Sequence, residues 1–177
     1  MDTEEFWDLV NHTYVSAEGQ IERQTDLLAD LLVALDDPER IVAFQSVFDS
    51  YLDSALTGEL WGAAALIEGG YSAEGFRDFR CWLISRGRVV YELVVADPES
   101  LADLDELDPW GGDTFGSAAR YAYERATGSQ LPEPAAADTP APYRTPFEDL
   151  ARRYPRLAAR VAPGADELAD ASLDSFD

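Results

Sequence analysis

Four arginines lie within one short segment of a chain that is otherwise strongly acidic, and their chemistry stands out. Arg77, Arg80, Arg86 and Arg88 are four of the 13 basic residues, which face 35 acidic ones. A guanidinium carries a planar fork of N–H donors that matches a carboxylate or a phosphate, so the cluster could hold a small anion. The aromatic side chains that could wall such a pocket are Trp61, Trp82 and Tyr91. The alternative, which we favour, is that the arginines pair with neighbouring acidic side chains.

Arg80 and Glu68 each fall on the apolar stripe of a predicted helix. At about 100° per residue, Arg80 lies between Phe76 and Leu83, and Glu68 follows Trp61 at a spacing of seven. Buried arginines are rare unless they are paired, so we expect an Arg80–Glu68 ion pair that fixes how the two helices dock. The alternative is a functional site, in which Arg80 grips an anionic ligand and Glu68 is an acid/base group.

Trp82 and Arg86 lie one helical turn apart on another flank of the same predicted helix. Both side chains can therefore line one surface patch. We expect this flank to border the main concavity, with Arg86 more exposed than Arg80 and accessible to a carboxylate or phosphate.

The residues that commonly catalyse reactions or bind metals are isolated in this sequence. His12 is the only histidine and Cys81 the only cysteine, and neither has an expected nucleophile or base beside it. Asp103, Asp105 and Asp108 resemble a calcium loop only faintly, because the glycine and glutamate that such a loop requires are missing. No phosphate-binding glycine motif, dinucleotide fingerprint or zinc spacing is found. We therefore predict no catalytic residues, no metal and no cofactor.

The composition restricts the partners. A formal charge of -22 repels the phosphate backbone, so we expect no direct nucleic-acid binding, whereas a basic protein partner or a small anionic ligand is compatible with the sequence. One cysteine allows no intrachain disulfide, which favours the cytoplasm. The longest apolar run, residues 60–67, is shorter than the roughly 20 residues of a membrane helix, and the acidic N-terminus is unlike a signal peptide. The sequence does not indicate an oligomeric state.

Apolar residues recur at helical spacing along most of the chain, which predicts an all-α fold. N-terminal capping residues, Pro38 and a series of glycines mark helix ends. Residues 88–95 could also form a strand, but a lone strand would have no partner, so we expect a helix there. The predicted helices are residues 3–13, 16–35, 38–55, 59–68, 73–86, 88–95 and 115–127, with one helical turn at 100–104 in an acidic loop over 97–113.

The C-terminal part differs in composition. Residues 1–128 are predicted to form a compact multi-helix bundle with short loops, followed by a Pro/Ala-rich linker at 129–146. Residues 147–163 are predicted to form short docking helices, and residues 164–177 a flexible acidic tail. We expect a second group of arginines to clamp this linker-attached helical appendage onto the acidic body: Arg144, Arg152, Arg153, Arg156 and Arg160. We expect the bundle to fold without the residues after Leu131.

Several short segments arrive in a recognisable order. The most distinctive covers residues 75–88, with the core Phe-Arg-x-Trp-Leu-Ile-x-x-Gly-Arg, and shorter ones precede and follow it at residues 6–7, 41–44, 60–64, 69–70 and 97–102. Over roughly its first three quarters the chain resembles the bacterial domain of unknown function 4240 family. That resemblance implies no activity.

Three functions from different classes are compatible with these patterns. The preferred hypothesis is a non-enzymatic binding or regulatory protein that presents its acidic loop or its arginine-aromatic segment to a protein or a small anionic ligand. The second is a small enzyme with a buried Glu68–Arg80 site. The third is an acidic mimic of a nucleic-acid backbone that blocks a basic protein, which requires carboxylates in rows at phosphate-like spacing.

Overall fold

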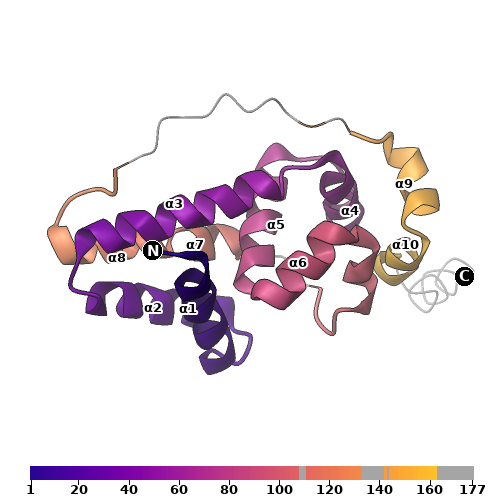
Figure 1. Cartoon of the computed structure of the whole chain (residues 1–177). Coiled ribbons are helices and arrows are strands. Elements are labelled where there is room, and N and C mark those ends of the chain that lie inside the picture. The colour runs from indigo at the N-terminus through magenta and orange to yellow at the C-terminus, as the bar shows by residue number, and fades with distance from the viewer. Residues whose placement is uncertain (108–110, 133–141, 143, 163–177) are drawn as a thin grey trace, which may run out of the picture.

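All regular structure in the described part of the chain is helical, which confirms the predicted all-α class (Figure 1). The computed structural model describes residues 1–107, 111–132, 142 and 144–162. Most of the predicted linker and the predicted acidic tail lie outside these residues. In chain order the elements are α1 (Thr3–Ser16), α2 (Ile21–Ala34), α3 (Pro38–Ser54), α4 (Gly58–Glu68), α5 (Ala73–Ser85), α6 (Arg88–Ala96), the 3-10 helix η1 (Pro98–Asp103), α7 (Gly112–Gly116), α8 (Ala118–Thr127), α9 (Phe147–Arg153) and α10 (Pro155–Val161).

The helix ends are set by local chemistry. The side chains of Asp2, Asp37, Thr57 and Ser72 each accept a backbone N–H in the first turn of the helix that follows. Gly69 ends α4 in a left-handed conformation with φ of 76°, which a residue without a side chain adopts at low cost. Such signals act within a few residues, so these ends could be predicted from the sequence.

Two predicted helices have different bounds in the structure. The second begins at Ile21 rather than near residue 16, because Glu18 and Gly19 have positive φ values of 53° and 79° and turn the chain between α1 and α2. The helix predicted over 115–127 is divided at Ser117 into α7 and α8. Both parts contact α2, but α7 packs mainly on α5, whereas α8 also packs on α3.

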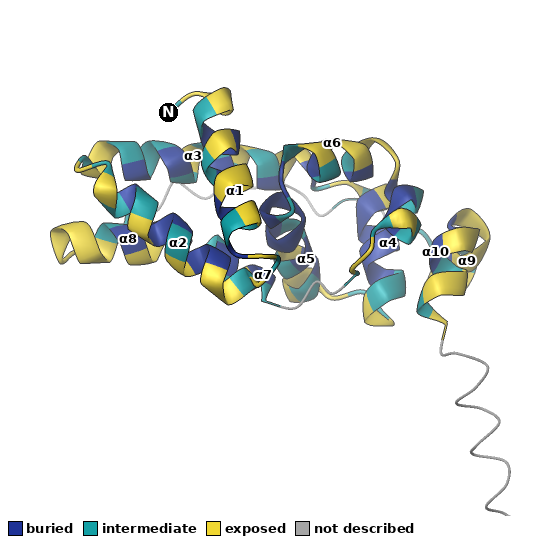
Figure 2. Cartoon of the chain, turned by 90° about the horizontal axis from the view of Figure 1, so that it is seen from below, coloured by how far each residue is buried: buried dark blue, intermediate teal, exposed yellow. Residues whose placement is uncertain are grey.

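The centre of the molecule is α5, which contacts α1, α3, α4, α6 and α7. Because neighbours surround it, α5 is buried well beyond its apolar stripe, and Cys81, Trp82 and Ser85 are buried together with Phe79 (Figure 2). The glycines of α7 permit the closest approach. A Cβ atom on Gly112 would overlap the carbonyl oxygen of Asp78.

The C-terminal helices α9 and α10 pack against α4 and η1 at one end of the molecule, far from the end of α8 (Figure 1). Leu150, Tyr154 and Leu157 are buried there and belong to the main hydrophobic cluster. The appendage is therefore docked, as expected. That the bundle folds without the residues after Leu131 stays a prediction, although three of these residues are buried against it.

Of the helices in the described ranges, none is long and apolar enough to cross a membrane.

Candidate functional site

Two cavities meet at the C-terminal end of α5, where the turn between α1 and α2 faces the segment after η1. Their volumes are about 270 and 390 Å³. Gly19, Arg86 and Glu106 line both cavities. The first is completed by Gln20, Ile21, Glu22, Gln24, Trp82, Ser85 and Gly111, and the second by Tyr14, Val15, Glu18, Val90, Leu104 and Asp105.

The guanidinium of Arg86 lies between two aromatic rings at the boundary of the cavities. Its central carbon is 4.8 Å from the ring centroid of Tyr14 and 5.8 Å from that of Trp82. Such cation–π contacts orient the planar group and leave N–H donors at its edges. Among the described residues, the carboxylate of Glu106 forms an ion pair with Arg86 at 3.7 Å, which is beyond hydrogen-bond distance. Arg86 is thus held in place by aromatic rings rather than by a tight ion pair.

A buried amide fixes the floor of the first cavity. Gln24 on α2 is almost completely buried, and its Nε2 donates to the carbonyl oxygen of Ser85 at 2.9 Å. The Ser85 hydroxyl in turn donates to the carbonyl oxygen of Trp82 at 2.6 Å. These bonds join α2 to the last turn of α5 and hold the backbone that carries Arg86. We call Tyr14, Gln24, Trp82, Arg86 and Glu106 the Arg86 site.

The walls around this one guanidinium are acidic. Glu22 lines the first cavity, Glu18 and Asp105 line the second, and Glu106 lines both. Like charges at such range repel a ligand of high negative charge, especially in a chain whose formal charge is -22. The site therefore suits a ligand with one anionic group at Arg86 and a cationic group towards the carboxylates.

The structure places Trp82 and Arg86 together in the lining of the first cavity, and their role as a binding site stays a prediction. The side chain of Arg86 is more covered than expected, with 14% exposed. Arg80 is also only partly exposed.

The predicted Arg80–Glu68 ion pair is wrong. Arg80 Nη1 donates to the carbonyl oxygen of Leu52 at 2.7 Å, its Nε donates to that of Phe76 at 3.3 Å, and the guanidinium lies over the Phe76 ring. Leu52 belongs to the last turn of α3, whose carbonyls have no partner within the helix and carry partial negative charge. Burial lowers the pKa of Arg80, and these acceptors compensate the buried charge. Arg80 caps α3 instead of binding a carboxylate.

Glu68 lies at the exposed end of α4, where its carboxylate covers Gly75 at the start of α5. Partial burial raises the pKa of Glu68, and the neighbouring charge of Asp78 raises it further. Within the described ranges, no guanidinium is paired with Glu68. The acid/base site proposed for Glu68 and Arg80 is therefore not assembled, because their helices bring the two side chains to different neighbours.

The predicted aromatic walls are also separated. Trp61 stacks on Phe76 at 5.1 Å, and Tyr91 is buried with its hydroxyl donating to the carbonyl oxygen of Tyr51 at 2.7 Å. Neither lines the cavities at Arg86. Helical periodicity placed these residues correctly on apolar faces. It could not show that the faces pack against different partners.

The remaining arginines of the segment lie outside the site. Arg88 pairs with Glu4 and Glu92 at 2.7 Å each, and Arg77 is exposed. Pairing with neighbouring acids, the alternative favoured from sequence, is seen for Arg88 and, at the longer distance of 3.7 Å, for Arg86 with Glu106. Sequence reasoning missed Tyr14 and Gln24, whose only signal is that they flank the break between the first two helices.

In the part of the chain that the structure describes, no three His, Cys, Asp or Glu side chains are grouped so that they could hold a metal ion. The comparisons with known proteins give one result. The family model described as a protein of unknown function (DUF4240) matches residues 1–125, which include every residue of the Arg86 site and none of α9 and α10. No curated protein and no solved structure matches the chain.

Proposed function

We propose that this chain, which belongs to the DUF4240 family of proteins of unknown function, is a non-enzymatic binding module. Its Arg86 site binds a small zwitterion with one carboxylate and one cationic group, such as an amino acid. The observation that carries this proposal is the position of the Arg86 guanidinium, which lies between Tyr14 and Trp82 where the two cavities meet. It has no hydrogen-bonded carboxylate of its own among the described residues.

The binding mode follows from the charges around the site. The ligand carboxylate accepts N–H bonds from the edge of the Arg86 guanidinium, while the rings of Tyr14 and Trp82 cover its faces. The ligand ammonium lies towards the carboxylates of Glu22 and Glu106. Cavities of about 270 and 390 Å³ are close to the lower end of the usual range for ligand pockets, so the ligand is small.

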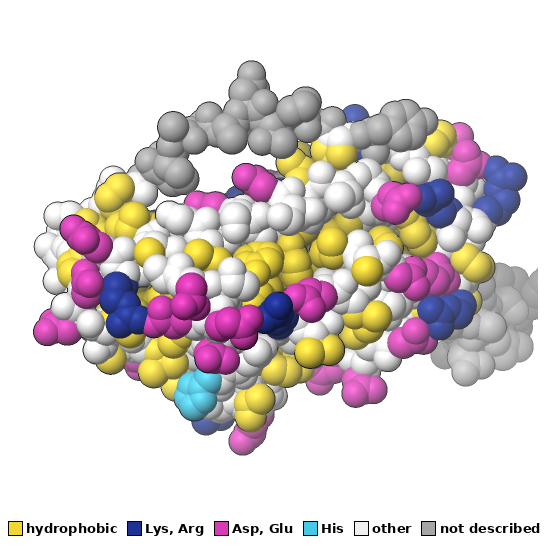
Figure 3. All heavy atoms as spheres, in the orientation of Figure 1, with side chains coloured by type: hydrophobic (Ala, Val, Ile, Leu, Met, Phe, Trp, Pro, Cys, Tyr) yellow, Lys and Arg dark blue, Asp and Glu magenta, His cyan; other side chains and the backbone are white. Residues whose placement is uncertain are grey.

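The other two hypotheses have less support. The enzyme hypothesis required Glu68 and Arg80 to form one site, and these two residues do not pair. A nucleic-acid mimic requires rows of carboxylates, whereas on the face in Figure 3 the acidic side chains are interrupted by arginines and by apolar surface.

We place the module in the cytoplasm. Cys81 is the only cysteine, so the fold needs no intrachain disulfide. Its thiol is buried at the centre of the molecule, and burial raises the pKa to about 11, which keeps the thiol protonated.

The experiment is a titration of the full-length protein with three probes: alanine as the zwitterion, acetate as a carboxylate without an ammonium, and ATP as a polyanion. Backbone amide shifts near Trp82 and tryptophan fluorescence report binding. We expect alanine to give saturable shifts, acetate to bind more weakly, and ATP to give none.

The matched variants are Arg86→Met, which keeps the stem between the rings, and Arg88→Met as a control outside the cavities. A charged hydrogen bond contributes about 1.5–3 kcal/mol, so Arg86→Met should weaken binding by about tenfold or more. Arg88→Met should bind like the wild type. If alanine gives no response, or the same response in Arg86→Met as in the wild type, the proposal is wrong.

A further inference from the structure

The helices α9 and α10 pack against a surface of the family-matched part of the chain. This surface belongs to α4 and η1, and both of these elements are within residues 1–125. Leu150, Tyr154 and Leu157 enter it at spacings of four and three and are buried. We call the face around Glu59, Trp61, Gly62, Glu99 and Asp103 the appendage groove.

A glycine on α4 makes the seat for the first of these side chains. A Cβ atom on Gly62 would lie 2.9 Å from Cδ2 of Leu150 and 3.4 Å from the Tyr154 ring. The Tyr154 hydroxyl donates to the carbonyl oxygen of Glu59 at 2.9 Å. The groove is thus shaped for a leucine followed by an aromatic residue that reaches a backbone acceptor.

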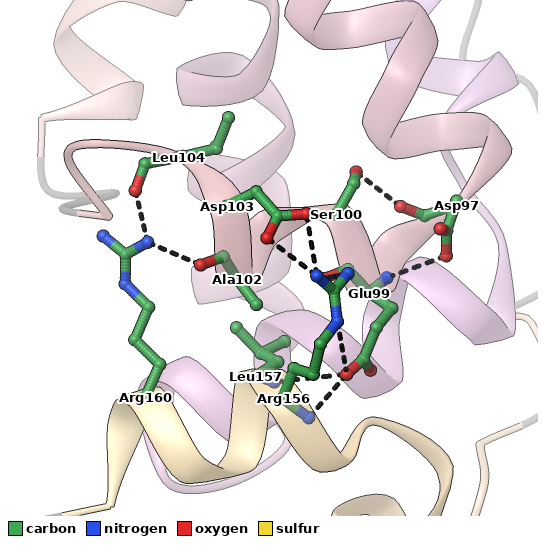
Figure 4. Close-up of polar contacts among 9 residues, drawn as sticks. All are labelled: Asp97, Glu99, Ser100, Ala102, Asp103, Leu104, Arg156, Leu157 and Arg160. Atoms are coloured by element: carbon green, nitrogen blue, oxygen red, sulfur yellow. Dashed lines mark hydrogen bonds and ion pairs between the residues drawn. The ribbon is translucent and has the colours of Figure 1, made fainter.

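The edge of the groove accepts arginine. Arg156 binds the Asp103 carboxylate at 2.7 Å, and its backbone N–H donates to Glu99 at 2.6 Å (Figure 4). Arg160 donates to the carbonyl oxygens of Ala102 and Leu104 at the end of η1 (Figure 4). Carboxylates and free helix-end carbonyls together make this edge a binding surface for guanidinium groups.

The fit of the appendage is close in its apolar part and incomplete in its polar part. In the described residues, Trp61 Nε1 and Glu99 Oε2 are buried without a hydrogen-bond partner. A buried polar atom without a partner costs about 1–3 kcal/mol in proteins. The ion pair of Arg156 with Asp103 is largely exposed, and exposed pairs contribute little. A segment that also satisfies these two atoms would bind the groove more tightly.

We propose that the appendage groove is a docking surface for a basic partner protein, and that α9 and α10 occupy it in cis until the partner displaces them. The partner presents a helical segment with a leucine, an aromatic residue and a second leucine at spacings of four and three, followed by arginines. A second copy of this chain is a poorer occupant, because each copy has a formal charge of -22 and the copies repel each other. A basic partner is attracted by the same field.

The test uses a fluorescent peptide with the sequence of residues 144–162 as a stand-in for the partner, titrated into full-length protein. The cis segment competes with the peptide, so weakening the cis segment should raise the apparent affinity of the peptide. We expect the double variant Arg156→Ala, Arg160→Ala to bind the unmodified peptide several-fold more tightly than the wild type. Arg152→Ala is the matched control, because Arg152 is 82% exposed and pairs within α9 with Asp149.

A second peptide keeps every arginine but replaces both leucines with alanine, so it separates docking from attraction of a basic peptide to an acidic protein. We expect it not to bind. Equal binding of the two peptides, or equal affinity of the double variant and the wild type, would overturn the proposal. A dimer of the double variant in light scattering would also overturn it, because the occupant would then be a second copy of this chain.

Discussion

Replacing Arg80 with methionine should destabilise the protein although no carboxylate loses its partner. Methionine fills the space of the arginine stem beside Phe76 but cannot donate to the carbonyl oxygen of Leu52, which Nη1 reaches at 2.7 Å. That carbonyl then remains at the end of α3 without this donor, in a place that α5 covers.

The size of the effect follows from the type of bond. A hydrogen bond from a charged donor contributes about 1.5–3 kcal/mol. For a chain of this length, 1 kcal/mol lowers the melting temperature by about 2–4 °C. Arg80→Met should therefore lower the melting temperature by roughly 3–12 °C. Arg77→Met, at an exposed position of the same helix, should change the free energy of unfolding by no more than about 0.5 kcal/mol.

The assay is urea unfolding followed by tryptophan fluorescence, applied as a double-mutant cycle with Glu68→Gln. Because Arg80 and Glu68 do not pair, the two changes should be additive within about 0.5 kcal/mol. A coupling free energy above about 1 kcal/mol would show that the pair forms in solution and would refute this account of Arg80. A silent Arg80→Met would refute the capping role.

Three further predictions concern packing, pH and the appendage. Gly112→Ala should lower the melting temperature strongly, because the new methyl group overlaps the Asp78 carbonyl oxygen and overpacking costs about 1–3 kcal/mol or more. The control Gly70→Ala should leave the melting temperature unchanged, because its methyl group meets no atom within 4 Å. Burial raises the pKa of the Cys81 thiol from 9.0 to about 11, so folding disfavours the thiolate. The urea midpoint of the wild type should therefore fall as the pH rises from 9 towards 11, and the midpoint of Cys81→Ala should fall less steeply. Deleting the residues after Pro132 removes three buried side chains, each of which contributes about 1.5–3 kcal/mol by burial, so it should lower the urea midpoint; an unchanged midpoint would show that α9 and α10 are dispensable.

Much of the fold could be predicted because helix formation depends on neighbours a few residues apart. Asp37 and Pro38 start α3, and Gly69 ends α4, as their local chemistry requires. The same reasoning failed where tertiary contacts determine the bounds of a helix. The helix predicted over 115–127 is divided at Ser117, where α7, which packs on α5 and α2, gives way to α8, which packs on α2 and α3.

The sequence by itself determined that the chain is helical and that Trp82 and Arg86 share one flank of a helix, since periodicity fixes angles within a helix. Only the tertiary structure decided what each flank meets. Arg80 caps α3 rather than pairing with Glu68, and Arg86 meets Tyr14 from another helix. The physical reason is that a guanidinium can bind a carboxylate, a carbonyl oxygen or an aromatic ring, and the packing of helices far apart in sequence determines which of these lies within reach.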